Sequence, residues 1–372
     1  MKFIILFDTF RKGGLEKTCI QLCQEFSSRG LDFEIWTLAH SQPYLEIAIS
    51  GFLINCQVRY FSRYPSLFAG FLNSTSNIFF LSLKNHLSFV FLRLLFRPRL
   101  NLIIRHSNTI LYDLIIASVE GNDKVPSPLR ALARLNRRIR AYVKFFLTVS
   151  LYSSVKFHIA NCLENKMLLQ ILLNRHVYCY VNQKILPAAN IKLNRSTLHD
   201  TLRIIWASRY SPAKDIPTLV RALNKISLEK PDFKFFLYAY TSHPDAMKYD
   251  FKSFNFPSDK YEIFPWTSYS YQESDIFVHT SYHEGLANSF MEQLSNSTRF
   301  IVCPLTSSGF LEFAAITPSI KFYRPGDYNS LSSCLNQCIK TPSSYIDIRN
   351  VPVDKYEEQN AQFFDFISNP LP

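Results

Sequence analysis

Two glutamates, Glu284 and Glu292, carry the most chemical information in the sequence, and seven residues separate them. The apolar residues 276–278 predict a strand over 276–280 that ends just before Glu284, and the following pattern predicts a short helix that carries Glu292. Each carboxylate accepts several hydrogen bonds, which suits the vicinal hydroxyls of a sugar or a ribose. The spacing therefore indicates a site for a polyhydroxylated ligand at the carboxyl end of one strand.

The residues between the two glutamates add groups that suit a phosphate. Consecutive backbone N–H groups in a loop can form a concave anion site, and the candidates here are Gly285, Leu286, Ala287, Asn288 and Ser289. Asn288 or Ser289 is also the expected cap of the helix, because short polar side chains accept hydrogen bonds from the first helical N–H groups.

Two cations follow another predicted strand. Arg209 and Lys214 come directly after the apolar run 202–207. An arginine binds phosphate oxygens through two parallel N–H groups, whereas a lysine offers a compact charge. The two side chains are suited to one anionic group, and the alternative is that both are solvated surface cations.

A further anion-binding loop is predicted near the amino terminus. Gly13 and Gly14 separate the apolar run 3–7 from a helical pattern over 16–26. Glycines let a ligand approach the backbone closely, and a helix start offers N–H groups to an anion. The loop lacks both the G-x-G-x-x-G and the G-x-x-x-x-G-K-[ST] patterns, so a dinucleotide fingerprint and a Walker-type phosphate loop are unsupported. A plain turn is the alternative.

The elements that must position these residues form an alternating series of apolar runs and helical patterns, which favours parallel strands covered by helices on both faces. Further strands are expected over 33–38, 77–81, 102–105, 157–160, 177–181, 235–240, 261–264, 300–303 and 320–323, with the polar stretch 183–201 as linker. The sequence thus predicts an α/β fold of two doubly wound domains, 1–185 and 200–352. A C-terminal helix is expected in 353–372, and it could either cross back to the first domain or stay with the second.

The net charge of +12 lies in the first half of the chain, where residues 1–190 hold 23 Lys and Arg against 10 Asp and Glu. Residues 128–147 have helical periodicity with arginines along one side. Two interpretations are open: a packed helix with a solvated cationic face, or a helix that lies on anionic lipid. No nucleic-acid-binding motif is present, so we expect no nucleic-acid partner.

We expect a cytoplasmic protein, at the inner face of the membrane if that helix docks there. The apolar run at the amino terminus is too short for a signal peptide. The most apolar stretch, 78–95, contains charges that disfavour a spanning helix.

The segment Glu284-Gly-Leu-Ala-Asn-Ser-Phe-Met-Glu292 closely resembles the E-x7-E region of family 4 retaining glycosyltransferases, which have the GT-B fold. Three other segments resemble that family in the family's order. They are Gly13-Gly14-Leu15-Glu16, which resembles the family's G-G-x-E, the stretch from Ser208-Arg209 to Lys214, which resembles its G-R-x-x-x-x-K, and Tyr323-Arg-Pro-Gly-Asp327, which resembles its late P-x-G-D turn. The resemblance implies two Rossmann-like domains that face each other across a cleft.

The resemblance also implies a role for each matched residue. Arg209 and Lys214 would hold the diphosphate of a nucleotide-sugar donor, and Glu292 would bind the nucleotide ribose. Glu284 would contact hydroxyls of the donor sugar, and the glycines at 13 and 14 would line the cleft.

His106, which follows the predicted strand 102–105, resembles a family histidine that faces the donor sugar, with a structural role as the alternative. No D-x-D triplet occurs in the chain, so we expect no metal and no other cofactor. Cations and loop N–H groups would instead stabilise the leaving diphosphate.

The resulting hypothesis is a hexosyltransferase that moves a sugar, with retention, from a nucleotide donor to a glycan or lipid-linked acceptor. Bacterial-type surface polysaccharide or lipopolysaccharide assembly is the expected context. Ser208 replaces the family's usual Gly, and Asp215 its usual Gly or Asn. The alternatives are therefore a nucleotide-sugar 2-epimerase of similar fold, and a non-catalytic scaffold that binds membrane or glycan.

Overall fold

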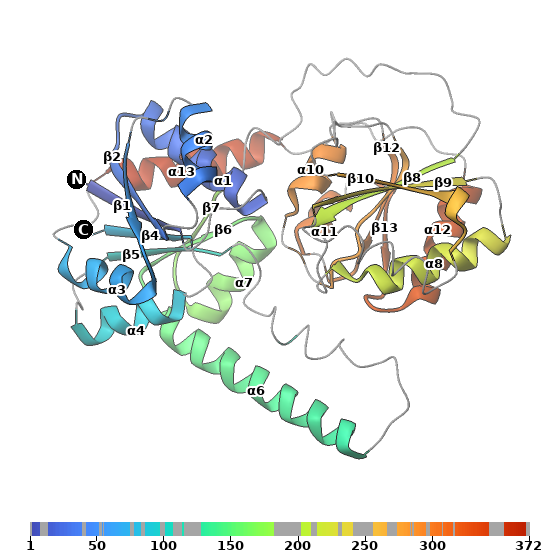
Figure 1. Cartoon of the computed structure of the whole chain (residues 1–372). Coiled ribbons are helices and arrows are strands. Elements are labelled where there is room, and N and C mark those ends of the chain that lie inside the picture. The colour runs from blue at the N-terminus through green and yellow to red at the C-terminus, as the bar shows by residue number, and fades with distance from the viewer. Residues whose placement is uncertain are drawn as a thin grey trace. The chain divides into compact units, whose positions relative to one another are not determined.

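The structure is a computed structural model of the 372-residue chain. It describes residues 2–7, 14–38, 42–51, 54, 56–74, 78–82, 86–96, 101–106, 114, 128–181, 202–209, 214–229, 233–240, 256–265, 274–282, 284, 286–294, 298–306, 308–314, 317–341 and 353–369. The chain divides into two compact units (Figure 1). The first comprises residues 1–111, 139–183 and 354–372, and the second comprises residues 112–138 and 184–353. The expected linker 183–201 lies outside the described residues.

The first unit is built on a parallel sheet with the strand order β3-β2-β1-β4-β5-β6-β7. Its strands are β1 (Lys2–Phe7), β2 (Asp32–Leu38), β3 (Gln57–Phe61), β4 (Ile78–Ser82), β5 (Asn101–Arg105), β6 (Phe157–Ala160) and β7 (Val177–Cys179). Its helices are α1 (Gly14–Ser28), α2 (Gln42–Gly51), α3 (Tyr64–Asn73), α4 (His86–Phe96), α7 (Leu163–Leu173) and α13 (Val353–Ser368). The long helix α6 (Pro128–Ser153) belongs to the first unit from Ile139 onward, and its part up to Arg138 belongs to the second unit.

The central strand β1 shows why this sheet needs helices on both faces. Its residues are buried from Phe3 to Phe7, and successive side chains of a strand point to opposite faces. Phe3 and Ile5 pack in one core cluster with α1 and α13, while Ile4 and Leu6 pack in another with α3, α4 and α7. The continuous apolar run in the sequence is therefore the signature of a doubly covered parallel strand.

The C-terminal helix α13 belongs to the first unit although it follows the second in sequence (Figure 1). Phe363, Phe364 and Ile367 are buried in the same cluster as Phe3 and Phe26. The buried Asn360 side chain also accepts a hydrogen bond from the Val181 N–H (2.9 Å) and donates one to the Val181 carbonyl (2.8 Å). This pair of bonds satisfies backbone groups just beyond β7.

The second unit has a parallel sheet with the strand order β10-β9-β8-β11-β12-β13. Its strands are β8 (Leu202–Arg209), β9 (Phe233–Tyr240), β10 (Tyr261–Pro265), β11 (Ser274–Val278), β12 (Thr298–Pro304) and β13 (Ile320–Tyr323). Its helices are α8 (Ile216–Glu229), the single 3₁₀ turn η4 (Ser258–Lys260), α10 (Asn288–Leu294), α11 (Ser308–Ala314) and α12 (Tyr328–Lys340).

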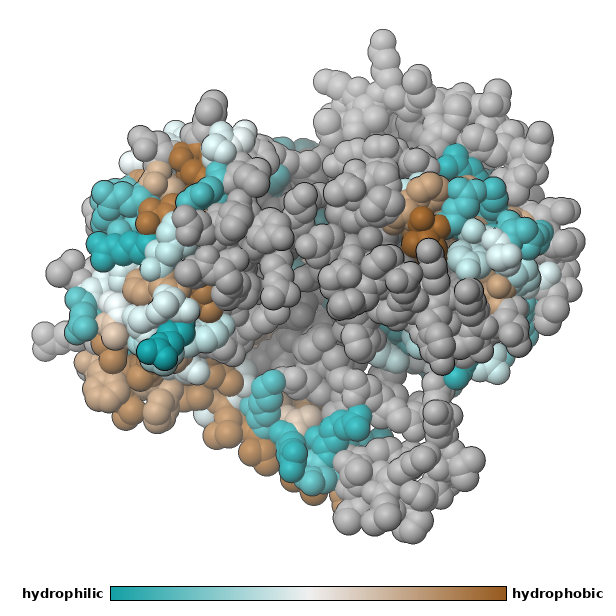
Figure 2. Space-filling view, viewed as in Figure 1, coloured by the Kyte–Doolittle hydropathy of each residue, from teal (hydrophilic) through white to brown (hydrophobic). Residues whose placement is uncertain are grey.

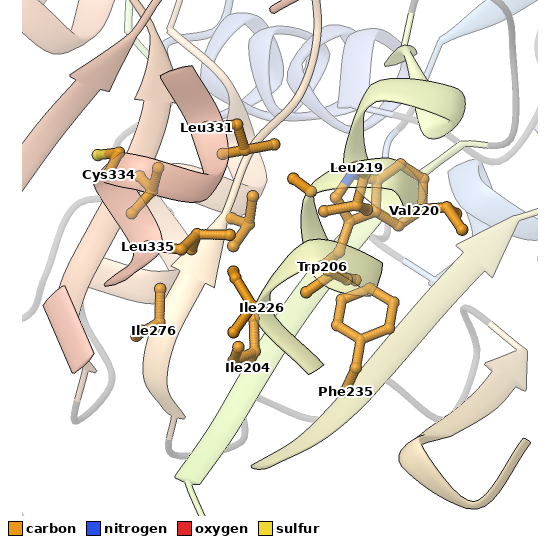
Figure 3. Packing of buried hydrophobic residues seen from close by; sticks show 14 of the residues in the cluster. Ile204, Trp206, Leu219, Val220, Ile226, Phe235, Ile276, Leu331, Cys334 and Leu335 are labelled. Atoms are coloured by element: carbon orange, nitrogen blue, oxygen red, sulfur yellow. The ribbon is translucent and has the colours of Figure 1, made fainter. Parts of the chain in front are cut away.

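A single apolar cluster fixes this sheet against α8 and α12 (Figure 3). Trp206 of β8 and Phe235 of β9 pack with Leu219 of α8 and Leu335 of α12, and all four are fully or almost fully buried. On the other face, the rings of Phe290 (α10) and Phe310 (α11) stack with centroids 4.0 Å apart. These two layers hold the strand ends in place for the site described below.

The turn before α12, over residues 324–327, contains the Gly and Asp of the segment that resembles the family's P-x-G-D turn. Gly326 has a φ of +74°, which favours glycine. Asp327 caps α12, because its side chain accepts hydrogen bonds from the N–H groups of Asn329 and Ser330.

The helix α6 corrects one of the two interpretations of residues 128–147. Ile139, Val143 and Phe146 lie on the apolar side of the helix and are more than half exposed. The packed-helix interpretation is therefore wrong for residues 135–147, where burial is described. Within the described part of the chain, no helix has the length and apolar character needed to cross a membrane.

Candidate functional site

The site lies where the strand order of the second sheet reverses. Strand β8 pairs with β9 on one side and with β11 on the other, so the loops after β8 and β11 leave the sheet side by side. Ligands of open α/β sheets bind at this kind of position, outside the carboxyl ends of the strands. Lys214 lies in the loop after β8 and Glu284 in the loop after β11.

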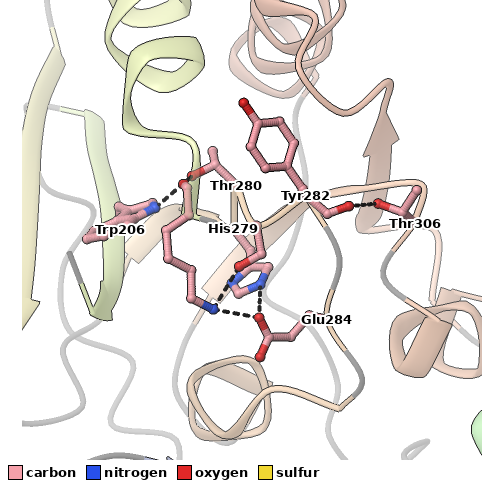
Figure 4. Close-up of polar contacts among 8 residues, drawn as sticks. Trp206, His279, Thr280, Tyr282, Glu284 and Thr306 are labelled. Atoms are coloured by element: carbon pink, nitrogen blue, oxygen red, sulfur yellow. Dashed lines mark hydrogen bonds and ion pairs between the residues drawn. The ribbon is translucent and has the colours of Figure 1, made fainter. Parts of the chain in front are cut away.

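Lys214 and Glu284 form an ion pair across these two loops (Figure 4). Lys214 Nζ donates to Glu284 Oε2 at 2.5 Å and to Ser281 Oγ at 2.8 Å. The lysine side chain is 16% exposed and the glutamate 24% exposed. The pair is thus withdrawn from bulk water yet open to a ligand on one side, which strengthens its interaction with a charged group.

A threonine hydroxyl locks the same two loops together (Figure 4). Trp206 Nε1, in β8, donates to Thr280 Oγ1 at 2.9 Å, and Thr280 Oγ1 donates to the Lys214 carbonyl at 2.6 Å. Both side chains are almost completely buried. These bonds fix the backbone of Lys214, and so they restrict the positions from which its ammonium can contact Glu284.

The local environment sets the charge of each site group. Burial alone would raise the pKa of the Glu284 carboxyl, but the Lys214 ammonium and the nearby His279 ring hold that pKa well below its usual range. His279 is buried, which lowers its pKa, and its Nε2 lies 3.6 Å from Glu284 Oε2. At neutral pH the site therefore holds an ammonium, a carboxylate and a largely neutral imidazole.

The remaining candidates after β11 lie on α10 or just before it. The helix begins at Asn288, and the carbonyl of Ala287 accepts from the N–H groups of Phe290 and Met291 (3.1 and 3.2 Å). The cap position is thus Ala287, so the expected capping by Asn288 or Ser289 is wrong by one or two residues. Leu286, Ala287 and Ser289 are buried and Asn288 is partly buried.

Several predicted residues are described only in part. Arg209 ends β8 in register with Tyr240, and Glu292 lies within α10, but their side chains are outside the described structure. Gly13 and Gly285 also lie outside the described residues, while Gly14 is the first residue of α1. Of the site residues predicted in the second unit, the described structure brings Lys214 and Glu284 into direct contact.

Asp215 explains one departure from the family pattern. It has a φ of +46°, in the left-handed region that favours Gly or Asn and that Asp also tolerates. Its side chain is buried, and its Oδ1 accepts from the Thr218 N–H at the start of α8 (3.4 Å). Asp215 thus adopts the backbone conformation that a Gly or Asn would adopt at this position.

In the first unit, His106 follows β5 and contacts a second histidine. His158 Nε2 lies 3.1 Å from the carbonyl oxygens of both Tyr152 and Val155. Because a carbonyl oxygen only accepts, the proton of the neutral His158 ring is on Nε2. Burial lowers the pKa of His158 to about 4, so this ring stays neutral at pH 7.

This arrangement determines the tautomer of His106. The bare Nδ1 of His158 lies 3.0 Å from His106 Nε2 and must accept the hydrogen bond. A neutral His106 therefore carries its proton on Nε2. His106 is 5% exposed, and it lies at the same carboxyl edge of the sheet as the start of α1, two strands away from β1.

Sequence reasoning missed three residues that shape the site. They are His279, Thr280 and Ser281, which lie at the end of β11 or directly after it. A usable signal was present, because hydroxyl residues directly after a buried strand lie at the ligand-binding edge of the sheet.

Solved structures share the fold of the whole chain, although no protein-family model and no curated protein matches it. HepE from Anabaena, solved in complex with UDP and glucose, is 13% identical over 100% of both chains with a TM-score of 0.68. The lipopolysaccharide outer core galactosyltransferase WaaB is 12% identical, with 98% of this chain and 100% of that chain covered and a TM-score of 0.61.

A putative UDP-N-acetylglucosamine 2-epimerase from Listeria monocytogenes is 10% identical, with 100% and 98% covered and a TM-score of 0.55. At these identities the likeness establishes the fold and not the activity. The chain has the GT-B fold, with two α/β units built on parallel sheets.

Substitution of Asp215 tests the positive φ at this loop. We expect Asp215→Ala to be less stable than Asp215→Gly by about 1–2 kcal/mol, because a Cβ is disfavoured in the left-handed region. Both variants lose the same side-chain contact, so urea unfolding of the two isolates the backbone effect. At the exposed helical control Lys225 the order reverses, with Gly less stable than Ala by about 1 kcal/mol. Equal stability of the two Asp215 variants would contradict the assignment.

The buried His158 predicts a dependence of stability on pH. Its folded pKa of about 4 lies below the value of about 6.5 in an unfolded chain, so the unfolded state binds more protons between these values. We expect His158 to lower the free energy of unfolding by about 1.4 kcal/mol per pH unit as the pH falls through this range.

Nitrogen-15 NMR and unfolding curves check this expectation. The His158 ring should remain in the Nε2–H form down to about pH 5. In His158→Gln, the free energy of unfolding should fall less steeply as the pH is lowered through this range. Protonation of His158 near pH 6.5 would contradict the assignment.

Proposed function

We propose that the protein is a glycosyltransferase that moves a sugar from a nucleotide-sugar donor to a glycan or lipid-linked acceptor. The observation that carries the proposal is the Lys214–Glu284 pair at the switch point of a GT-B sheet. The match of the surrounding residues to the E-x7-E pattern supports family 4 and a retaining reaction. The UDP- and glucose-bound HepE structure supports a nucleotide-sugar donor.

Lys214 is suited to the departing diphosphate. An ammonium has three N–H groups, and two of them donate to Ser281 and Glu284 in the described structure. The third is available for a phosphate oxygen. Negative charge grows on the diphosphate as the glycosidic bond breaks, so a fixed cation there stabilises the transition state more than the ground state. Arg209, at the end of the neighbouring strand, is proposed to share this role.

Glu284 is suited to the sugar. Its Oε2 is occupied by Lys214, and among the described residues Oε1 has no partner, so Oε1 can accept from a sugar hydroxyl. Its depressed pKa keeps it an acceptor at physiological pH. We propose that Glu292 binds the ribose, that the 285–289 loop contacts phosphate, and that the glycines at 13 and 14 line the donor or acceptor site.

His106, which follows β5 at the carboxyl edge of the first sheet, is proposed to face the donor sugar. We further propose that the reaction needs no metal ion, with the cations above in its place.

The acceptor is proposed to belong to surface polysaccharide or lipopolysaccharide assembly at the inner face of the cytoplasmic membrane. The basic first half of the chain and the exposed apolar residues of α6 support contact of residues 128–147 with anionic lipid. The TM-score of 0.61 with a lipopolysaccharide galactosyltransferase is consistent with this context.

A 2-epimerase is the second candidate, because a structure of that type shares the fold. The larger TM-score with HepE, 0.68 against 0.55, favours glycosyl transfer. Formation of an epimer without acceptor would identify the epimerase. A scaffold would bind vesicles or glycan and turn over no donor.

The proposal is tested by release of nucleoside diphosphate from UDP-, GDP- and ADP-sugars, with and without lipid-linked acceptor. We expect acceptor-dependent release with one donor. Lys214→Ala should lower kcat by about 10²–10³-fold and raise KM less, because it removes charge stabilisation that grows in the transition state. Glu292→Ala should mainly weaken nucleotide binding, through the lost ribose contact.

A matched control is available in the same sheet. Lys234 and Glu262 form an ion pair of 2.5 Å near the amino ends of β9 and β10, at the opposite edge from the site. Lys234→Ala should leave kcat and KM unchanged. Unchanged kinetics in both Lys214→Ala and Glu292→Ala would show that these positions are misassigned.

A further inference from the structure

Helix α6 carries a stripe of apolar side chains that are more than half exposed to solvent. Between 135 and 150, Ala141 is the only buried residue of the helix. The exposed apolar residues are Leu135, Ile139, Tyr142, Val143, Phe146 and Leu147, each at least 52% exposed. Their spacing of three and four places them on one side of the helix, over a length of about 18 Å at 1.5 Å per residue.

The stripe continues onto α4 (Figure 2). Phe91, Leu95 and Phe96 of α4 are 52%, 57% and 63% exposed. The two helices are joined at one end, because Arg93 Nη1 donates to the Ser154 carbonyl just after α6 (3.2 Å). Phe89 and Val90 of α4 also share a core cluster with Tyr152 of α6. Figure 2 shows hydrophobic surface gathered over α4 and along one edge of α6.

The charges on the two helices are all of one sign. Neither α4 nor α6 contains an Asp or a Glu, whereas α6 contains six Lys and Arg and α4 contains one Arg. Arg137, Arg138, Arg140 and Lys144 are exposed. On a helical projection at 100° per residue, Arg138 and Arg140 flank the apolar stripe on its two sides.

We propose that the exposed faces of α4 and α6 form one docking surface that inserts into the headgroup region of an anionic bilayer. The apolar stripe enters the boundary between headgroups and acyl chains, and the flanking arginines contact lipid phosphates. This inference deepens the membrane contact proposed above and does not depend on glycosyl transfer. It differs from electrostatic attraction alone, since apolar insertion supplies most of the affinity.

Charge complementarity selects a bilayer as the occupant. A helix with a broad apolar face, cations at its margins and no acidic residue matches the pattern of helices that lie in the membrane interface. Anionic headgroups attract each cation near the surface. A second copy of this chain would present the same row of cations, and the like charges would repel.

The test is sedimentation of the full chain with vesicles of phosphatidylcholine alone or mixed with phosphatidylglycerol. We expect binding to the mixed vesicles, and weaker binding to the neutral ones. The triple variant Leu135→Ser, Ile139→Ser, Phe146→Ser should weaken binding at least about tenfold, because it removes three insertable side chains. Phe91→Ser with Leu95→Ser should act in the same direction.

The matched control lies on α7 in the same unit, where Met167 and Ile171 are 62% and 76% exposed at the same i,i+4 spacing. Met167→Ser with Ile171→Ser should leave binding unchanged. All substituted side chains are exposed, so circular dichroism should show folded variants. Nucleoside diphosphate release with a soluble acceptor should persist in the stripe variants, which separates failure of docking from failure of the proposed function.

Three outcomes would overturn the inference. They are no vesicle binding by the wild-type chain, full binding by both sets of stripe variants, and a wild-type dimer in solution that the stripe variants convert to monomer. The last would identify the surface as an interface between copies.

Discussion

The ion pair between Lys214 and Glu284 is the constraint on which the candidate site depends. It joins the loops after β8 and β11, and the Trp206–Thr280–Lys214 bonds fix the lysine backbone beneath it. Burial raises the pKa of a carboxyl, and the neighbouring Lys214 ammonium opposes that rise and keeps Glu284 ionised. The pair can therefore offer a cation to a phosphate and a carboxylate to a hydroxyl from neighbouring positions.

The two units solve the same positioning problem with different chemistry. In the second unit, a charged pair lies in the loops after β8 and β11. In the first, backbone carbonyls fix the proton of His158 in β6 on Nε2, so its Nδ1 accepts a hydrogen bond from His106 after β5. The Asp215 departure from the family pattern leaves the loop geometry unchanged, since Asp accepts the positive φ that the position requires.

The continuous apolar strands were predictable because a strand buried on both faces has an uninterrupted run of apolar residues, as in residues 3–7 and 204–207. Strand β3 was missed because it is a partly exposed edge strand that contains Arg59 and has no such run. Lys214 and Glu284 could be named from spacing and resemblance. The Lys214–Glu284 contact, the bond from Lys214 to Ser281 and the partner of His106 join residues more than 50 positions apart, and spacing does not encode such tertiary pairings. The exposed stripe on α6 was unpredictable for the same reason, since periodicity defines an apolar side but not what covers it.

A pH titration of the Glu284 side-chain carboxyl by carbon-13 NMR tests the central claim most directly. The account predicts that the pKa of Glu284 lies well below the ordinary glutamate value of about 4.3. It also predicts that Lys214→Met raises this pKa, because the variant lacks the positive charge that opposes the effect of burial. An ordinary titration near 4.3 in the wild-type protein, unchanged in Lys214→Met, would show that the two groups do not act as a pair.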